Sequence, residues 1–431
     1  MSLVLQHLVQ VHRQGIDRRS FLRRTSAAGL ALGACELGTL NFRDAMTAQA
    51  QELKKSGYSL ILLWMQGGPS QMETFDPKPD TPNGGPTKAI STAVSGIQIA
   101  QGWDKVAGVM NDVALIRSMT NKEGQHARAT YQMHTGYVPA GTIKHPSIGC
   151  AIARELAPEE FELPSVVAVG RTVGAGYLGV NYEPFVVSNP GQMPSNVAAT
   201  VPANRLNRRL GLLDKLEGEF AGRGGEVVVS DHKKLYEKTA KMVLSPSVAA
   251  FDIEQESQSL RDRYGSSNFG KGCLLARRLV EAGSTFVEVA ANGWDTHQDN
   301  FTRTSNNAAE VDPGFGALIA DLKDRGLLDK TLVLWMGEFG RTPKINPNTG
   351  RDHYPRCFNA AIAGGGIKGG QVIGASTADG TAVQDHPVSV LDLFSTICQQ
   401  VKIDPKKENI SPLGRPMKIV DGGTPIAGLI G

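Results

Sequence analysis

Acidic and histidine side chains follow one apolar segment of this chain at a spacing suited to metal binding. In "EVAANGWDTHQDNF", Asp295 and His297 lie two residues apart, just past an expected strand. A carboxylate and an imidazole at this spacing can both face one cation. The alternative is a turn in which Asp295 only caps the helix that follows, so the pair by itself leaves both interpretations open.

A second polar group follows the segment "TLVLWMGEFGRTP". Glu338 lies at the end of the expected strand, Arg341 follows in a loop, and Arg351, Asp352 and His353 come further along that loop. Metal ligands beside guanidinium groups suit an anionic substrate held against a cation. The alternative is a loop of ion pairs in which the arginines neutralise the carboxylates. If the two polar groups lie on neighbouring strands, the metal interpretation is favoured.

Other candidates lie in the first half of the chain and near its end. "RSMTNKEGQHARATYQMHTG" offers Thr120 as a nucleophile and His126 as a catalytic histidine. "MQGGPSQMETFDPKP" adds the carboxylates Glu73 and Asp76. His386 lies at an expected helix start, where it could reach back to a metal or could be a surface histidine. Taken singly, residues of these types more often have structural roles.

The apolar segments that precede these residues predict the fold. They are near-continuous rather than alternating, as in "YSLILLWMQGG", which is typical of strands covered on both faces. Segments of helical period such as "FGKGCLLARRLVEAG" separate them, so we expect an α/β fold around a mostly parallel sheet. In such sheets ligands bind beyond the carboxyl ends of the strands. Residues 204–264 are polar and helical in pattern, which predicts a helical insertion within a single domain of residues 51–431.

Composition limits the classes of function. The chain has 431 residues, 41% of them hydrophobic, which is enough for a sizeable core. The formal net charge is only +3, so we expect neither nucleic acid nor an anionic membrane as a partner. The cysteines show no CxxC spacing, and we predict no disulfide between them.

The N-terminal residues 1–50 are interpreted as an export signal. Arg18 and Arg19 stand just ahead of "FL", and a short run of small apolar residues follows. This pattern is typical of the twin-arginine pathway, and the apolar run is too short to span a bilayer. We therefore expect a periplasmic or extracellular protein with no transmembrane span. The signal could end by cleavage after Ala50 or by lipidation at Cys35, and both remain open.

The ordered set "GGPSQMETFDPKP", "GWDTHQDNF", "GEFGRTP", "GRDHYP" and "AGGGIKGGQVIG" resembles the bacterial domain-of-unknown-function family fifteen-oh-one. The resemblance covers nearly all of the mature chain. That family is similar to the alkaline phosphatase and sulfatase superfamily. The resemblance implies an alkaline-phosphatase-like three-layer sandwich, with one or two divalent metals at the strand ends in active members.

The resemblance also implies roles for single residues. Asp295 and His297 resemble the superfamily's late Asp-and-His metal motif, although the usual spacing is wider. Glu338, or the pair Asp352 and His353, resembles its adjacent Asp-His ligands. His386 lies about where a last histidine ligand often occurs.

The chain departs from the superfamily pattern at two places. Gln66 stands where the first strand of active members ends in a metal-binding aspartate. Neither Cys150 nor Cys357 has the sequence context needed for conversion to formylglycine, which argues against a type I sulfatase. At the expected nucleophile position the chain offers Lys122 or Glu123, which leaves Thr120 as the candidate hydroxyl.

We therefore expect an exported metal-dependent hydrolase of this superfamily, acting on a phosphate or related anionic ester. A divalent cation (Zn, Ca, Mg or Mn) would polarise the substrate, and Arg341 or Arg351 would hold its charge. The expected partners are a small anionic ester or an envelope polysaccharide, together with the twin-arginine translocase during export. The alternative is a non-catalytic binding or structural protein of the cell envelope derived from the same fold.

Overall fold

The computed structural model describes residues 56–158, 160–195, 197 and 201–430. The predicted export signal, with Ala50 and Cys35, lies outside the described residues. None of the helices within this part of the chain is both long enough and apolar enough to cross a membrane.

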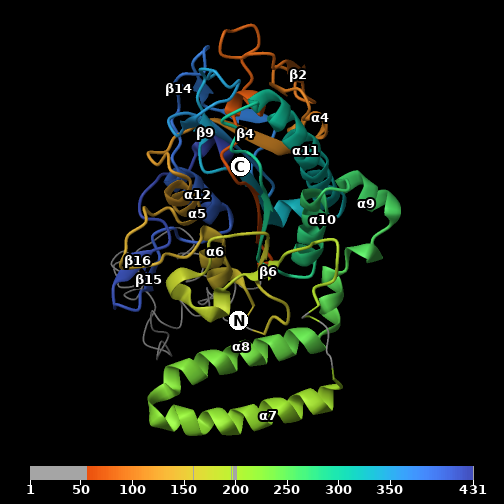
Figure 1. The fold of residues 1–431 in the computed structure, drawn as a ribbon, viewed down its shortest axis with the longest axis vertical. Coiled ribbons are helices and arrows are strands. Elements are labelled where there is room, and N and C mark those ends of the chain that lie inside the picture. The colour runs from red at the N-terminus through yellow and green to blue at the C-terminus, as the bar shows by residue number, and fades with distance from the viewer. Residues whose placement is uncertain (1–55, 159, 196, 198–200, 431) are drawn as a thin grey trace, which may run out of the picture.

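A central sheet of eight strands organises the fold (Figure 1). Only β11 runs against its neighbours, and the other pairings in this sheet are parallel. This confirms the predicted mostly parallel sheet. In their order across the sheet, the strands are β12 (Gln371–Ile373), β4 (Val113–Met119), β11 (Phe358–Ala363), β8 (Thr331–Met336), β1 (Ser59–Met65), β7 (Phe286–Ala291), β5 (Val166–Val169) and β6 (Phe185–Val187).

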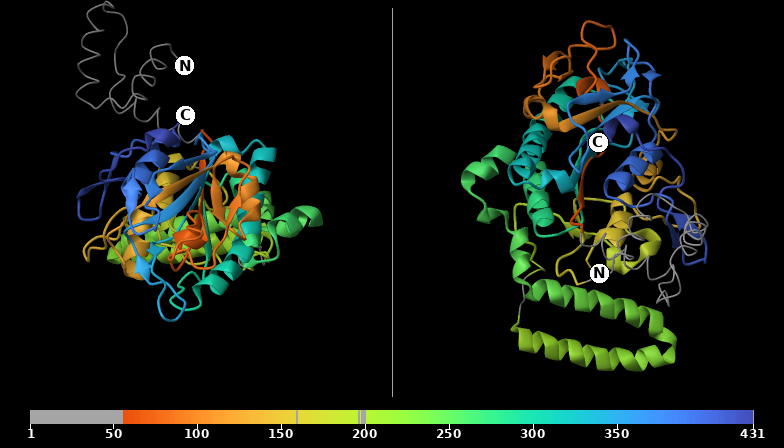
Figure 2. Two further views of the ribbon diagram at one scale, coloured as in Figure 1. Left: turned by 90° about the horizontal axis from the view of Figure 1, so that it is seen from above. Right: turned by 180° about the vertical axis from the view of Figure 1, so that it is seen from behind.

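Helices cover both faces of the sheet and make a three-layer architecture (Figure 2). One face packs against α10 (Asn268–Glu281) and α11 (Asn300–Asp324), and the other against α5 (His126–Thr135), α6 (Ile148–Leu156) and α12 (Val390–Gln400). Along β1, Leu62 belongs to the buried cluster on the α5 side, whereas Leu63 belongs to the cluster on the α10 side. Every residue of β1 is buried, because successive side chains point into opposite layers.

A helical segment and several short elements complete the described chain. The segment predicted as a helical insertion contains α7 (Ala203–Phe220), α8 (Glu226–Leu244) and α9 (Gln258–Tyr264). Helices α7 and α8 form a hairpin that lies across one end of the molecule (Figure 1). Besides short 3-10 and π-helical turns, the remaining elements of the described chain are α4 (Asp104–Gly108), β2 (Ala89–Ser91), β3 (Gln98–Ala100), β9 (Gly340–Arg341), β10 (His353–Tyr354), β13 (Ala375–Ser376), β14 (Val383–Asp385), β15 (Glu408–Ile410) and β16 (Pro416–Lys418).

Candidate metal centre

The adjacent parallel strands β8, β1 and β7 bring polar residues to one edge of the sheet. Glu338 follows β8, Gln66 follows β1, and Asp295 follows β7. His126 arrives at the same place as the first residue of α5, and His353 as the first residue of β10. The expectation that the two polar groups follow neighbouring strands is therefore wrong, because β1 lies between β8 and β7, although both groups reach the same edge of the sheet.

Local structure positions the two histidines. Helix α5 begins at His126 because the Gln125 side chain accepts a hydrogen bond from the backbone N–H of Arg128. His353 is held by the antiparallel pairing of β10 with β9, in which it lies opposite Arg341. A short antiparallel ribbon thus folds the long loop after β8 back over the end of the sheet.

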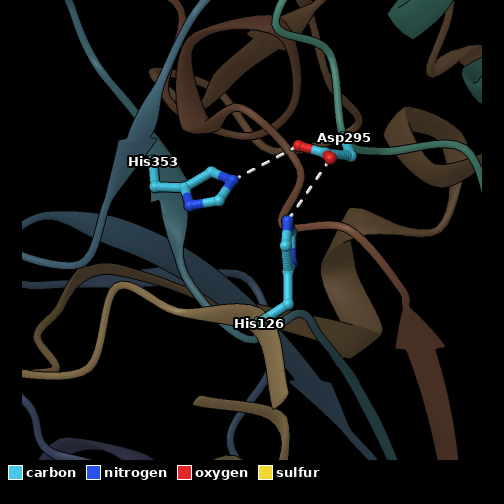
Figure 3. Close-up of side chains that lie close together, drawn as sticks. All are labelled: His126, Asp295 and His353. Atoms are coloured by element: carbon cyan, nitrogen blue, oxygen red, sulfur yellow. Dashed lines mark hydrogen bonds and ion pairs between the residues drawn. The ribbon is translucent and has the colours of Figure 1, made fainter. Parts of the chain in front are cut away.

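The side chains of His126, Asp295 and His353 point toward one another (Figure 3). The Nε2 atom of His126 lies 3.4 Å from one oxygen of Asp295, and that of His353 lies 3.3 Å from the other. One ligand atom from each of the three residues lies within 4.8 Å of the others, so the group could hold a metal ion. His297 joins them, with its Nε2 3.1 Å from Asp295 and 3.0 Å from Nε2 of His353.

The second ring nitrogen of each histidine faces a hydrogen-bond acceptor. The Nδ1 atom of His126 lies 2.7 Å from Oε1 of Glu338. In His353, Nδ1 lies 2.8 Å from the carbonyl oxygen of Gly124. Because these acceptors bind an N–H at Nδ1, they leave the Nε2 lone pairs directed at the centre. Metal-ligating histidines have this arrangement, in which a carboxylate or carbonyl fixes the tautomer.

His297 follows the same rule, because its Nδ1 lies 2.8 Å from Oδ1 of Asp352. Its Nε2 then faces Nε2 of His353 at 3.0 Å, where two lone pairs repel unless a cation or a proton lies between them. The buried Nε2 of His126 has no hydrogen-bond partner among the described residues. An unpartnered imidazole nitrogen, a close pair of imidazole nitrogens and a carboxylate beside them are what a bound cation would satisfy, so the residues fit a metal.

A buried arginine sets the charge of the centre. Arg341 is fully buried and donates to Oδ1 of Asp295 at 2.7 Å. Partial burial opposes ionisation of Asp295, but the hydrogen bond and the charge of Arg341, together with the charges of His126 and His297, outweigh it and lower the pKa of Asp295 to about 2. Burial lowers the pKa of His353, whereas the hydrogen bond to Glu338 raises the pKa of His126. At neutral pH the centre therefore holds an ionised carboxylate beside a neutral His353.

Glu338 supports the centre from within the protein. It is fully buried, and its Oε1 accepts hydrogen bonds from the backbone N–H of Gly67 at 2.9 Å and from Nε2 of Gln66 at 3.3 Å, besides its bond to His126. Gly67 has a φ of +115°, and a Cβ built there would lie 2.4 Å from the backbone nitrogen of Asp295. Glycine is needed because the backbones after β1 and β7 approach this closely.

Arg351 has a different role from the one expected. Its guanidinium is fully buried and forms a two-point ion pair with Glu73, with N–O distances of 3.0 and 2.8 Å. The remaining N–H groups donate to backbone carbonyls of Thr342, Pro343 and Asn83. All five donors are used, so none is left to hold a substrate anion. This corrects the prediction that Arg351 binds substrate, and Glu73 correspondingly lies outside the centre.

Two other predicted residues lie outside the histidine and aspartate group. The Thr120 hydroxyl faces the carbonyl oxygen of Val388 at 3.4 Å. His386 is exposed, and its Nδ1 lies 3.0 Å from the side chain of the adjacent Asp385. The structure therefore gives no contact that joins Thr120 or His386 to the centre.

Most residues of the centre were predicted from the sequence, but three of them have other contacts than expected. Glu338 and Asp352 were expected as ligands, and here each accepts a hydrogen bond from a histidine ring instead. His126 was expected as a catalytic residue, and here its Nε2 faces Asp295 beside the other imidazoles. Its place at the start of the helix after β4 is the signal that could have indicated a ligand. The carbonyl of Gly124 offered no signal, because every residue carries one.

The family described as "Protein of unknown function (DUF1501)" matches residues 58–430. The chain belongs to this family. No curated protein matches this member of the family.

Several solved structures resemble this chain at low sequence identity. The sulfatase PsFucS1 from Pseudoalteromonas sp. is 13% identical, with 82% of this chain and 72% of that chain covered and a TM-score of 0.37. For the phosphonate monoester hydrolase of Agrobacterium radiobacter the identity is 13%, the coverage 86% and 77%, and the TM-score 0.32. An alkaline phosphatase superfamily protein from Vibrio parahaemolyticus is 10% identical, with 81% and 67% covered and a TM-score of 0.34. At such identities, function must be inferred from this chain's own residues.

Proposed function

We propose that this protein is a metal-dependent hydrolase that acts on a phosphate or related anionic ester. One observation carries the proposal: ligand atoms of His126, His353 and Asp295 lie within 4.8 Å of one another, and Nε2 of His297 lies beside Asp295 and His353. An acceptor at each Nδ1 holds its imidazole ring in place. Such convergence requires three segments that are distant in sequence to meet at one edge of the sheet. It is the donor arrangement of a metal site rather than of a surface ion pair.

The donor set favours zinc among the four cations considered. Imidazole nitrogens suit zinc, whereas calcium and magnesium prefer sites built almost wholly from oxygen. We propose His126, His297, His353 and Asp295 as the ligands. Glu338 and Asp352 would orient two of the imidazoles and increase their basicity.

A cation in this position would polarise an oxygen of the bound ester and stabilise the negative charge that develops during hydrolysis. The residues of this chain would hold the ligands in the protonation states and orientations that metal binding needs. Arg341 keeps Asp295 ionised, and burial keeps His353 neutral. The carbonyl of Gly124 fixes the orientation of the His353 ring.

A second candidate function is metal-dependent binding without turnover, in the cell envelope. It is favoured by the arginines, because Arg341 and Arg351 are both fully buried and bonded to protein acceptors. Neither offers an exposed guanidinium to an incoming anion. The side chain of Thr120 likewise lacks a contact with the centre. Under either function, we propose export through the twin-arginine pathway and an anionic ester or a sulfated or phosphorylated polysaccharide as the bound molecule.

Elemental analysis of the purified chain, followed by assays with aryl phosphate, phosphodiester and aryl sulfate, tests both candidates. We expect one divalent metal per chain or more, hydrolysis of at least one phosphate substrate, and loss of metal and activity in His353→Ala. His386→Ala is the matched control, since this exposed histidine lies outside the centre and its replacement should change neither. Metal without turnover on any substrate would favour the binding protein. Full metal content in both His353→Ala and His126→Ala would refute the proposed centre.

A further inference from the structure

The hairpin of α7 and α8 presents large apolar side chains to solvent. Helix α7 is the outermost element at its end of the molecule, and α8 lies between it and the body (Figure 1). On α7, Leu212, Leu216 and Phe220 are 60%, 63% and 56% exposed. Large apolar side chains gathered on one helix face mark an interaction surface, whereas single ones do not.

Leu212 and Leu216 are not the leucines that hold the hairpin together. Leu210 and Leu213 are half-buried and line the space between α7 and α8 with Tyr236 of α8. At about 100° of rotation per residue, Leu212 and Leu216 form a second apolar stripe, roughly a quarter-turn away from that seam. The outer stripe therefore has no partner within the described part of the chain.

Charged residues extend this stripe at both ends. Arg205 precedes Leu212 by two helical turns and Glu219 follows it by two turns, so all three lie on one face. Both charged side chains are exposed. Among the described residues, neither Arg205 nor Glu219 has an ion-pair partner. From its N-terminal to its C-terminal end, the outer face of α7 is therefore first basic, then apolar and then acidic.

We propose that this face binds the same face of a second copy of the chain, with the two α7 helices antiparallel. A twofold axis beside Leu212 would place Arg205 of each copy opposite Glu219 of the other and would bring the leucines together at the centre. Parallel pairing would instead set like charges opposite each other. A self-complementary patch of this kind is what an isologous dimer requires.

The area of this face determines how strongly the two copies should bind each other. Helix α7 has 18 residues and is about 27 Å long, so with the adjoining edge of α8 it offers roughly 500 Å² per copy. The total of about 1,000 Å² is near the lower limit for a specific interface. The dimer should therefore dissociate on dilution.

Sedimentation of the full chain over a range of protein concentrations tests the proposal. We expect a doubling of mass at high concentration, which Leu216→Asp abolishes. Asn207→Asp is the matched control, because Asn207 is exposed on the opposite side of α7 and its replacement should leave the dimer intact. Unchanged circular dichroism would show that each variant is folded. A monomer at every concentration, or a dimer unaffected by Leu216→Asp, would overturn the proposal.

Charge reversal tests the antiparallel orientation. Arg205→Glu should weaken the dimer about tenfold or more, and adding Glu219→Arg in the same chain should restore it. In addition, the cysteine introduced by Leu212→Cys should form a disulfide with the same cysteine of the second chain in the dimer. Phe220→Cys should not, because eight residues on either side of the axis separate the two sites by roughly 24 Å. Crosslinking through Phe220→Cys alone would exclude the antiparallel arrangement, and failure of the double reversal to restore the dimer would remove the role of charge.

Discussion

Two buried glutamates at the same edge of the sheet should respond differently to loss of charge. Glu338 is fully buried and accepts from Nδ1 of His126, whereas Glu73 is 5% exposed and pairs with the buried Arg351. Replacement of either by glutamine keeps the size of the side chain and removes its charge. We expect Glu338→Gln to impair metal binding and Glu73→Gln to impair folding.

The magnitudes follow from what each carboxylate contacts. Glu338 fixes the tautomer of one imidazole, and loss of such a group weakens metal affinity about 10- to 100-fold, or roughly 1.4 to 2.7 kcal/mol. Its loss leaves no unpaired cation, because the ring of His126 can remain neutral. Loss of Glu73 strands a guanidinium that is 0% exposed, which costs about 3 to 5 kcal/mol.

The assay measures both properties in both variants. Metal affinity is obtained by competition with a chromophoric chelator, and the free energy of unfolding from urea titration of the metal-free protein. Glu338→Gln should bind metal less tightly with a small change in unfolding. Glu73→Gln should unfold at lower urea and, under conditions where it is folded, bind metal as the parent chain does.

Two results would contradict these expectations. If Glu73→Gln lost metal as Glu338→Gln does, while both remained folded, Glu73 and Arg351 would have to belong to the centre. Equal loss of stability in the two variants with metal affinity unchanged would remove the supporting role assigned to Glu338.

Three further changes test particular contacts. Burial raises the pKa of Asp312 to about 6, so its protonated form stabilises the fold at low pH, and this stability is lost as pH rises through 6. The free energy of unfolding of Asp312→Asn, measured relative to that of the parent chain in urea titrations, should rise by up to about 3 kcal/mol between pH 4 and pH 7. A difference between variant and parent that did not change with pH would contradict this. Gly67→Ala should destabilise the chain by more than about 1 kcal/mol and lower its metal content, whereas the control Gly96→Ala, with φ of +84° and open space around it, should only destabilise it. Burial disfavours the charge on His134, but Glu288 at 3.1 Å outweighs it and raises the pKa of this histidine, so Glu288→Gln should cost about 3 to 5 kcal/mol below pH 6.5 and less at higher pH. A loss that grew with pH would exclude a charged His134.

Much of the fold could be predicted because buried parallel strands have a simple signature. The segments that form β1 and β8 are apolar at every position except the first, and the segment of β7 is apolar except at Glu288. Strands of this kind need cover on both faces, which implies the helical layers. The antiparallel direction of β11 could not be predicted, since strand direction depends on long-range pairing with β4 and β8.

The sequence predicted which residues gather at the site better than it predicted what each of them binds. Asp295, His297 and His353 were named because polar residues after parallel strands meet at one edge. Arg351 was misassigned because its partner, Glu73, lies 278 residues away and no local pattern joins them. An arginine that is paired with a buried carboxylate has the same sequence appearance as one that binds substrate.

The sequence by itself determined which segments are buried and which residues follow the strands, because apolar periodicity and strand polarity are local properties. Only the tertiary structure decided which groups turn toward the centre and which support them. His126 and Glu338 are 212 residues apart, yet a 2.7 Å contact between them fixes which ring nitrogen is free. Metal binding depends on positions to within a fraction of an ångström, and long-range packing sets those positions.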